Sequence, residues 1–151
     1  MQQEFSLSRE IRSLFEQEIE NLSLEQLNHI PPTHNNNIFW NITHCIAIQQ
    51  SLCYRLSNLP TSVELELVKA YRRGTKPEQA VHQELVDRVH GLLQKSVDWL
   101  ERDWMEGVFE QYTPYTVALG THLTNINQAI TFNNVHEGIH YGYILALKKL
   151  L

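Results

Sequence analysis

The chain has 151 residues, a formal net charge of -5 and 42% hydrophobic residues. This length predicts one domain, residues 1–151, with a core that needs no disulfides, and the acidic balance argues against nucleic acid as a partner, because duplex binders usually carry a basic patch. No run of about 18 apolar residues occurs and residues 1–5 lack the features of a signal peptide, so we expect no membrane span and a cytoplasmic location.

The first half of the chain predicts two long helices with a short helix between them. Apolar side chains recur every three or four residues through positions 6–21, which is typical of a helix with one buried face. Ser23 and Gln26 have the spacing of a capping box and predict a short helix after them. Two prolines within residues 29–35 predict a loop. A second long helix is expected over residues 35–58, with these side chains facing inward: Trp40, His44, Ile48 and Leu52.

The second half predicts two more long helices. Residues 63–73 alternate like a strand for six positions, but we favour a short helix that ends at Gly74. Pro77 is well placed to begin a third long helix that ends near Asp103, and residues 104–123 are expected to form a structured connection. A last helix, capped by Thr124, is expected to bury one stripe that includes Asn133, His136 and His140. Together these elements predict the all-α class: a four-helix bundle with a short extra helix, irregular connections and almost no strand.

The two cysteines, Cys45 and Cys53, fall in the second long helix, eight positions apart. At a rise of about 1.5 Å per residue they are roughly 12 Å apart along the helix, and a disulfide needs Cα atoms within about 7 Å. We therefore expect two buried free thiols.

Three histidines are the candidate metal ligands. His136 and His140 are four residues apart, so their side chains share one face of a helix and could hold one ion. His44 is predicted on the buried face of another helix and would supply a third ligand. A single inward histidine is usually a hydrogen-bonded core residue, so spacing alone leaves both interpretations open. Three imidazoles with free coordination positions would form a site of the catalytic type.

Residues 136–140 also match the H-E-x-x-H signature of zinc metalloproteases, in which Glu137 would be the general base. Such proteases take a third ligand downstream of the motif, and none of the eleven residues after His140 is His, Asp, Glu or Cys. Glu137 also lies about 100° around the helix from His136. A metalloprotease is therefore the minor alternative.

Two segments resemble motifs of the DinB-like family. Residues 36–44, with Trp40 four positions before His44, resemble the second-helix motif of that family. Residues 136–144, with His136, His140 and Gly142, resemble the paired-histidine motif of its last helix. The resemblance extends over nearly the whole chain in the order and length of the helices.

This resemblance implies a four-helix bundle in which His44, His136 and His140 hold a divalent metal, nickel or zinc. It also implies a homodimer and a thiol-dependent transferase or isomerase that uses a low-molecular-weight thiol such as bacillithiol or mycothiol. The chain departs from the family pattern at Tyr141 and Tyr143, where a basic residue and a glutamine are frequent, so the substrate class cannot be carried over.

The first functional hypothesis is therefore a metal-dependent transferase or hydrolase, because a metal-coordinated thiol or water is a strong nucleophile at neutral pH. No catalytic residue stands out, and Glu137 is the nearest carboxylate in sequence. The alternative is a dimeric bundle that binds a metal or ligand without catalysis. An open cleft to the histidines, for which Trp40 and Tyr143 are the expected lining, would favour the enzyme.

Overall fold

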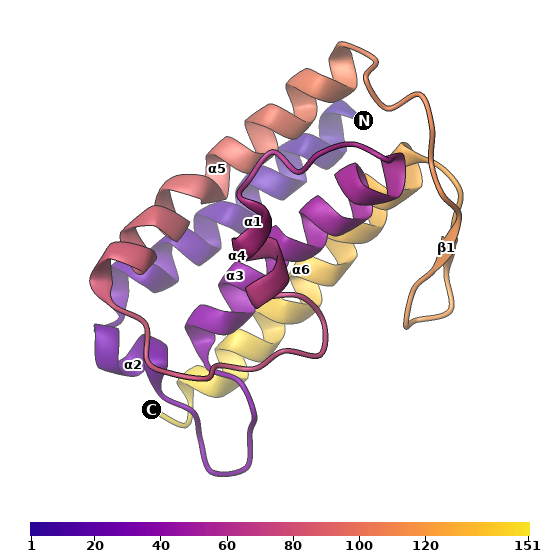
Figure 1. The fold of residues 1–151 in the computed structure, drawn as a ribbon. Helices are drawn as coiled ribbons and strands as arrows, with labels where there is room; N and C mark the ends of the chain where they lie inside the picture. The colour runs from indigo at the N-terminus through magenta and orange to yellow at the C-terminus, as the bar shows by residue number, and fades with distance from the viewer.

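The computed structural model describes residues 1–151 as an all-α bundle (Figure 1). The four long helices run in the chain order α1 (Gln2–Asn21), α3 (Ile38–Gln49), α5 (Gln83–Met105) and α6 (Ile126–Lys148). Two short helices, α2 (Leu24–Asn28) and α4 (Leu65–Ala70), lie in the connections. The strands β1 (Tyr115–Thr116) and β2 (His122–Leu123) form one small antiparallel hairpin, so the all-α prediction is confirmed.

Each long helix packs against two others. Helix α1 contacts α5 and α6, and α3 contacts the same two helices, so α1 and α3 are diagonal to each other. Figure 1 shows that α3 and α5 run in one direction while α1 and α6 run in the other. Helices α3 and α6 are therefore antiparallel neighbours, which brings the middle of each beside the middle of the other. No helix is long and apolar enough to cross a membrane.

The helix starts follow the local capping signals. The Ser23 hydroxyl accepts a bond from the Gln26 amide, and the Gln26 side chain accepts one from the Ser23 amide, as the predicted capping box requires. The Asn37 side chain caps α3, and Asn125 rather than the predicted Thr124 caps α6. Helix α1 begins at Gln2, earlier than predicted, because Phe5 is buried in the core and anchors an additional turn.

The second long helix changes its winding before it ends. Regular α-helix gives way to a π-helix at Gln50–Tyr54 and then to a 3₁₀ turn at Arg55–Ser57. Asn58 then adopts a left-handed conformation with φ 58° and terminates the helix. The predicted span of this helix is therefore right, but the π-helix was not anticipated. Such π segments are frequent at functional sites.

The third long helix begins six residues later than predicted. Pro77 is not its first residue: residues 77–82 are extended or turn, and His82 precedes the first helical turn. Two hydrogen bonds between Asn28 and the backbone of Val81 hold this segment against the end of α2. The short helix α4 confirms the helical rather than the strand interpretation of residues 63–73.

A charged pair lies in the middle of the bundle. Arg12 on α1 donates two hydrogen bonds to Glu137 on α6, from Nε to Oε2 at 2.9 Å and from Nη2 to Oε1 at 2.6 Å. Asn133, one turn earlier on α6, donates to the same Oε1 at 2.6 Å. Arg12 and Glu137 are both fully buried. This bidentate pair fixes how α6 is rotated against α1.

We predict that Arg12→Met destabilises the fold by about 3–5 kcal/mol, because it leaves the Glu137 carboxylate buried without its charge partner. The double variant Arg12→Met/Glu137→Met should recover at least half of that loss, since it leaves no unpaired charge. Urea unfolding followed by circular dichroism measures both.

The control is Arg102→Met, whose exposed side chain pairs with the neighbouring Asp103 on α5. That change should leave the free energy of unfolding nearly unchanged, because an exposed ion pair contributes little. If Arg12→Met costs no more than the control, the buried pair is not what secures α1 to α6.

Candidate metal centre

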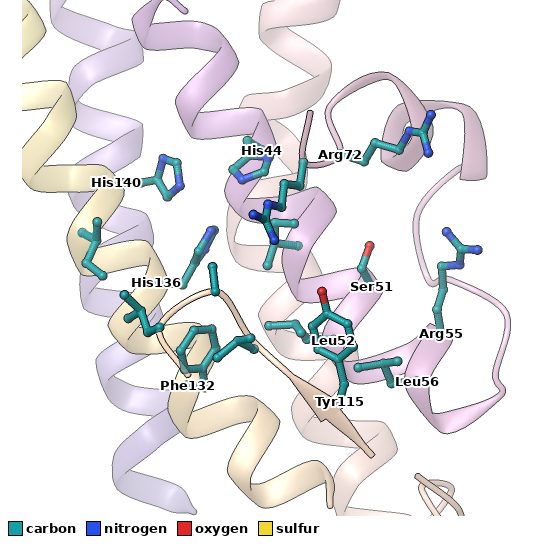
Figure 2. A pocket seen from close by; sticks show the side chains of 16 residues that line it. His44, Ser51, Leu52, Arg55, Leu56, Arg72, Tyr115, Phe132, His136 and His140 are labelled. Atoms are coloured by element: carbon teal, nitrogen blue, oxygen red, sulfur yellow. The ribbon is translucent and has the colours of Figure 1, made fainter. Parts of the chain in front are cut away.

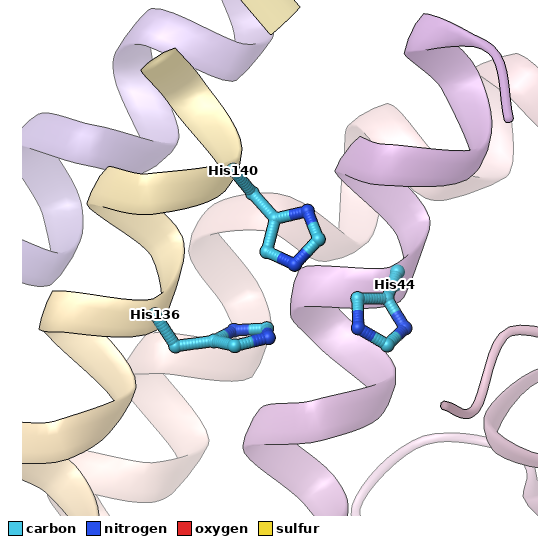
Figure 3. Close-up of side chains that lie close together, drawn as sticks. All are labelled: His44, His136 and His140. Carbon is cyan, nitrogen blue, oxygen red and sulfur yellow. The ribbon is translucent and has the colours of Figure 1, made fainter. Parts of the chain in front are cut away.

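Three imidazoles from two helices meet between α3 and α6. His44 projects from α3, and His136 and His140 project from successive turns of α6 (Figure 3). Their ring centroids are 5.3 Å apart for His44 and His136, 4.8 Å for His44 and His140, and 4.5 Å for the pair on α6. One ring nitrogen from each residue lies within 4.8 Å of the others. The structure therefore brings together the three residues that spacing alone placed on two separate helices.

Two of the three imidazole rings, those of His44 and His140, are hydrogen-bonded through Nδ1, which leaves Nε2 of each free. Nδ1 of His44 lies 2.6 Å from the carbonyl oxygen of Tyr71, which can only accept, so this nitrogen carries the proton. Nδ1 of His140 lies 2.8 Å from Oδ1 of Asn41. The amide of Asn41 is oriented because its Nδ2 donates to the carbonyl of Asn37 at 2.8 Å. In both rings Nε2 is left as a neutral lone-pair donor, the arrangement in which histidine ligands are usually held.

Trp40 supports the centre from one side. Its ring stacks on His44 with centroids 4.5 Å apart and planes 13° apart. Its Nε1 donates to the Thr75 hydroxyl at 3.3 Å, and the side chain is almost fully buried. The indole therefore restricts the tilt of the His44 ring while the Tyr71 carbonyl restricts its rotation.

His136 lacks such a partner. Its Nδ1 is buried and has no hydrogen-bond partner in the chain. Burial, together with the neighbouring imidazoles, lowers the pKa of His136 to about 3. Burial and His44 lower the pKa of His140 to about 4, and burial lowers the pKa of His44. All three rings are therefore neutral at pH 7, the form in which imidazole binds metals. Three neutral imidazoles with one nitrogen each within 4.8 Å of the others, and a buried His136 nitrogen without a partner in the chain, fit a cation at this place.

A cavity of about 660 Å³ opens onto all three histidines (Figure 2). We call it the histidine cavity. One wall is the continuous face of α3 and the π-helix, from His44 to Arg55, and another is the face of α6 from Phe132 to His140. The hairpin side contributes Tyr115 and residues 117–119. The volume lies within the range of small-molecule sites, so the histidines are accessible to a substrate-sized ligand.

Three sequence expectations need correction. Glu137 does not face the histidines: it is fully buried in the ion pair with Arg12, which removes the basis for a general-base role. Trp40 does not line the histidine cavity, because its ring lies against His44 and borders a separate hollow beneath residues 69–85. Tyr143 does not line it either, since its partly exposed ring packs near His34 with centroids 5.8 Å apart.

Sequence reasoning also missed several residues of the centre. Asn41 is three positions before His44, so helical spacing could have placed it on the same side of α3. The Tyr71 carbonyl has no sequence signal, because any residue carries one. Arg55, Arg72 and Arg73 line the histidine cavity, and their spacing gave no reason to group them.

The fold and the site define a helical bundle with a three-histidine centre of the metal-binding type between two antiparallel helices. The family model of the DinB superfamily matches residues 8–144, and the chain belongs to this superfamily. A comparison with curated proteins finds no match.

The pKa shifts predict how metal-free protein responds to acid. The folded-state pKa of His136 lies below its ordinary value near 6.5, so the unfolded chain takes up the proton first as the pH falls. The stability tied to this ring is therefore complete above about pH 6.5 and is lost progressively as the pH falls toward 3. Between pH 7 and 5 the wild type should lose about 2 kcal/mol more unfolding free energy than His136→Gln.

Urea unfolding in the presence of a chelator, at half-unit pH steps, measures this difference. His90→Gln is the control, because His90 is exposed and contacts Glu20 on the surface. Parallel pH profiles for wild type and His136→Gln would contradict the prediction.

Proposed function

We propose that this protein is a divalent-metal-dependent enzyme in which His44, His136 and His140 hold the ion. One observation carries the proposal: the three histidines lie together, two of them are oriented by hydrogen bonds, and all three open to a cavity of about 660 Å³. A structural metal site is closed by a fourth protein ligand, whereas a catalytic site keeps a position for substrate. No Asp, Glu or Cys joins the cluster of three histidines. Nickel and zinc are the ions proposed, since both accept imidazole ligands.

The ion would supply Lewis acidity, which lowers the pKa of a thiol or water that reaches it from the cavity. The residues of the chain supply the rest. Asn41 and the Tyr71 carbonyl keep Nε2 of two histidines directed at the ion, and Trp40 keeps the His44 ring in its plane. More than half of the lining residues are apolar, so a bound ligand would displace water there and strengthen electrostatic interactions at the site.

We propose an external thiol rather than a thiol of the chain as the nucleophile. Cys45 and Cys53 are both fully buried free thiols, and burial raises the pKa of each. A thiol with a raised pKa and no access to solvent is a poor nucleophile. A low-molecular-weight thiol entering the cavity meets neither obstacle. Thiol transfer is therefore the reaction class proposed first, and hydrolysis the second.

The two alternatives have less support. A bundle that only sequesters a metal has no use for a substrate-sized cavity at the metal. A metalloprotease of the H-E-x-x-H type requires a glutamate beside the ion, and Glu137 is instead bound to Arg12 of α1.

The first test is metal content. Wild-type protein purified without a nickel column and loaded with nickel or zinc should retain about one ion per chain by mass spectrometry. His44→Ala should retain almost none, because two imidazoles are too few for a tight site. Asn41→Ala should keep the stoichiometry but bind the ion roughly 10–100-fold more weakly, through loss of the His140 orientation. His90→Ala, on the surface of α5, should match the wild type.

The second part of this test is activity. Metal-loaded wild type should accelerate the reaction of a thiol, such as bacillithiol, mycothiol or cysteine, with a chlorinated dinitrobenzene, or the hydrolysis of nitrophenyl esters. His44→Ala should lose that activity. Stoichiometric metal without turnover would favour the binding-only alternative, and equal turnover in His44→Ala would refute the metal-dependent mechanism.

We also propose that the chain forms a homodimer through the outer face of α6. This helix is apolar on two sides: Ile144 and Leu147 lie in the core, whereas Val135, Ile139 and Tyr143 form an exposed row at four-residue spacing. Val135 and Ile139 are 51% and 53% exposed. A helix that is apolar all round is usually covered on both sides.

Sedimentation should give twice the chain mass for the wild type and the single-chain mass for Val135→Glu/Tyr143→Glu. The control is Leu7→Glu, which places the same charge on an exposed apolar position of α1. A monomeric wild type, or a dimer that survives the double substitution but not Leu7→Glu, would refute this interface.

A further inference from the structure

The histidine cavity has an unusual charge for this chain. The chain as a whole carries 17 acidic and 12 basic residues. The lining of the cavity nevertheless contains Arg55, Arg72 and Arg73 and no aspartate or glutamate. The charged side chains of this lining are therefore all arginines, which give it a positive charge.

These three arginines also differ from the rest. The chain has seven arginines, and the other four each pair with a carboxylate: Arg9 with Asp98, Arg12 with Glu137, Arg88 with Glu64 and Arg102 with Asp103. The three without a carboxylate partner are the three that line the histidine cavity. In a chain with an excess of carboxylates, this pattern leaves three guanidinium groups available to an anion from outside.

The arginines come from two segments that are tied to the metal centre. Arg72 and Arg73 follow Tyr71, whose carbonyl accepts the bond from His44. The turn continues to Thr75, whose hydroxyl donates to the Arg72 carbonyl at 2.8 Å and accepts from Trp40. Arg55 stands at the end of the π-helix, on the same face as His44 and Ser51. The backbone that carries the charges is therefore fixed relative to the histidines.

The remaining lining is mostly apolar. Leu52 and Leu56 come from the second long helix and Phe132 comes from α6 on the other side of the cavity (Figure 2), and the hairpin adds Val117 and Leu119. A ligand that fills this space needs an apolar part for these walls and oxygen anions for the guanidinium groups. Guanidinium binds carboxylate and phosphate through paired hydrogen bonds.

We propose that the histidine cavity binds an amphipathic organic anion, with its carboxylate or phosphate held by Arg55, Arg72 and Arg73 and its apolar part against Leu52, Leu56 and Phe132. The proposal rests on the proposed function for the reaction, but the binding itself needs only the arginines and the apolar walls.

The test is calorimetric titration with three probes of one size: hexanoate, hexyl phosphate and the neutral hexanamide. Each is titrated into chelator-treated and into metal-loaded protein. Wild type should bind one or both anions saturably, and hexanamide at least about 10-fold more weakly, because it lacks the charge. Comparison of hexanoate with hexyl phosphate shows which head group the arginines prefer.

Arg72→Gln, Arg73→Gln and Arg55→Gln should each weaken anion binding several-fold, and the triple variant roughly 100-fold, with hexanamide binding unchanged. Arg88→Gln is the matched control: it removes one exposed arginine charge from the pair with Glu64 and should bind like the wild type. All four positions are exposed, and circular dichroism melting should confirm that the variants fold.

The outcomes separate this inference from the metal proposal. Arginine-dependent binding in chelator-treated protein supports the inference even if no metal is taken up and no turnover is found. Binding that requires metal and ignores the arginine substitutions would overturn it, because the anion would then be a metal ligand. Absence of saturable binding, or equal binding of hexanoate and hexanamide, would overturn it as well.

Discussion

The rotation of α6 about its own axis is the constraint on which the centre depends. Adjacent residues of an α-helix point about 100° apart, so the direction in which Glu137 is held sets the direction of His136. The bidentate pair with Arg12 commits Glu137 to α1, and His136 and His140 are thereby directed at α3. A slip of one residue in this packing would move the histidines away from His44. A buried ion pair contributes little net stability, but it is well suited to selecting one such arrangement, because every alternative leaves a charge unpaired.

The parts of the structure that the sequence predicts are those set by local spacing. Helical or capping-box spacing predicts three features: the His136–His140 pair, the inward position of His44 and the capping box at Ser23. The predicted start at Pro77 failed because a signal that permits a helix does not require one, and contacts of Asn28 with Val81 hold that segment in another form. Glu137 is a catalytic candidate from the sequence alone, because the sequence cannot show that its partner is Arg12, 125 positions away.

The arginines that line the histidine cavity could not be predicted from the sequence. Arg55, Arg72 and Arg73 lie in segments that end helices or join them, where no periodicity relates one residue to another. Their proximity follows from a π-helix that reorients the end of the second long helix and from a turn fixed to His44 through Tyr71. The net charge of the whole chain is negative, whereas the charged side chains that line the cavity are positive. Local electrostatics of a site can therefore contradict net charge, and the two require separate arguments.

The charges of the proposed ligands fit together with those of the proposed metal. Three neutral imidazoles leave a divalent ion with its full charge of two, since no carboxylate or thiolate of the chain joins the cluster. Three guanidinium groups around one cavity repel one another, and water screens this repulsion where their side chains are exposed. An anionic substrate, and a nucleophile that becomes anionic on losing its proton, both reduce that repulsion. The arrangement thus favours a negatively charged ligand at one end of the cavity and loss of a proton at the other.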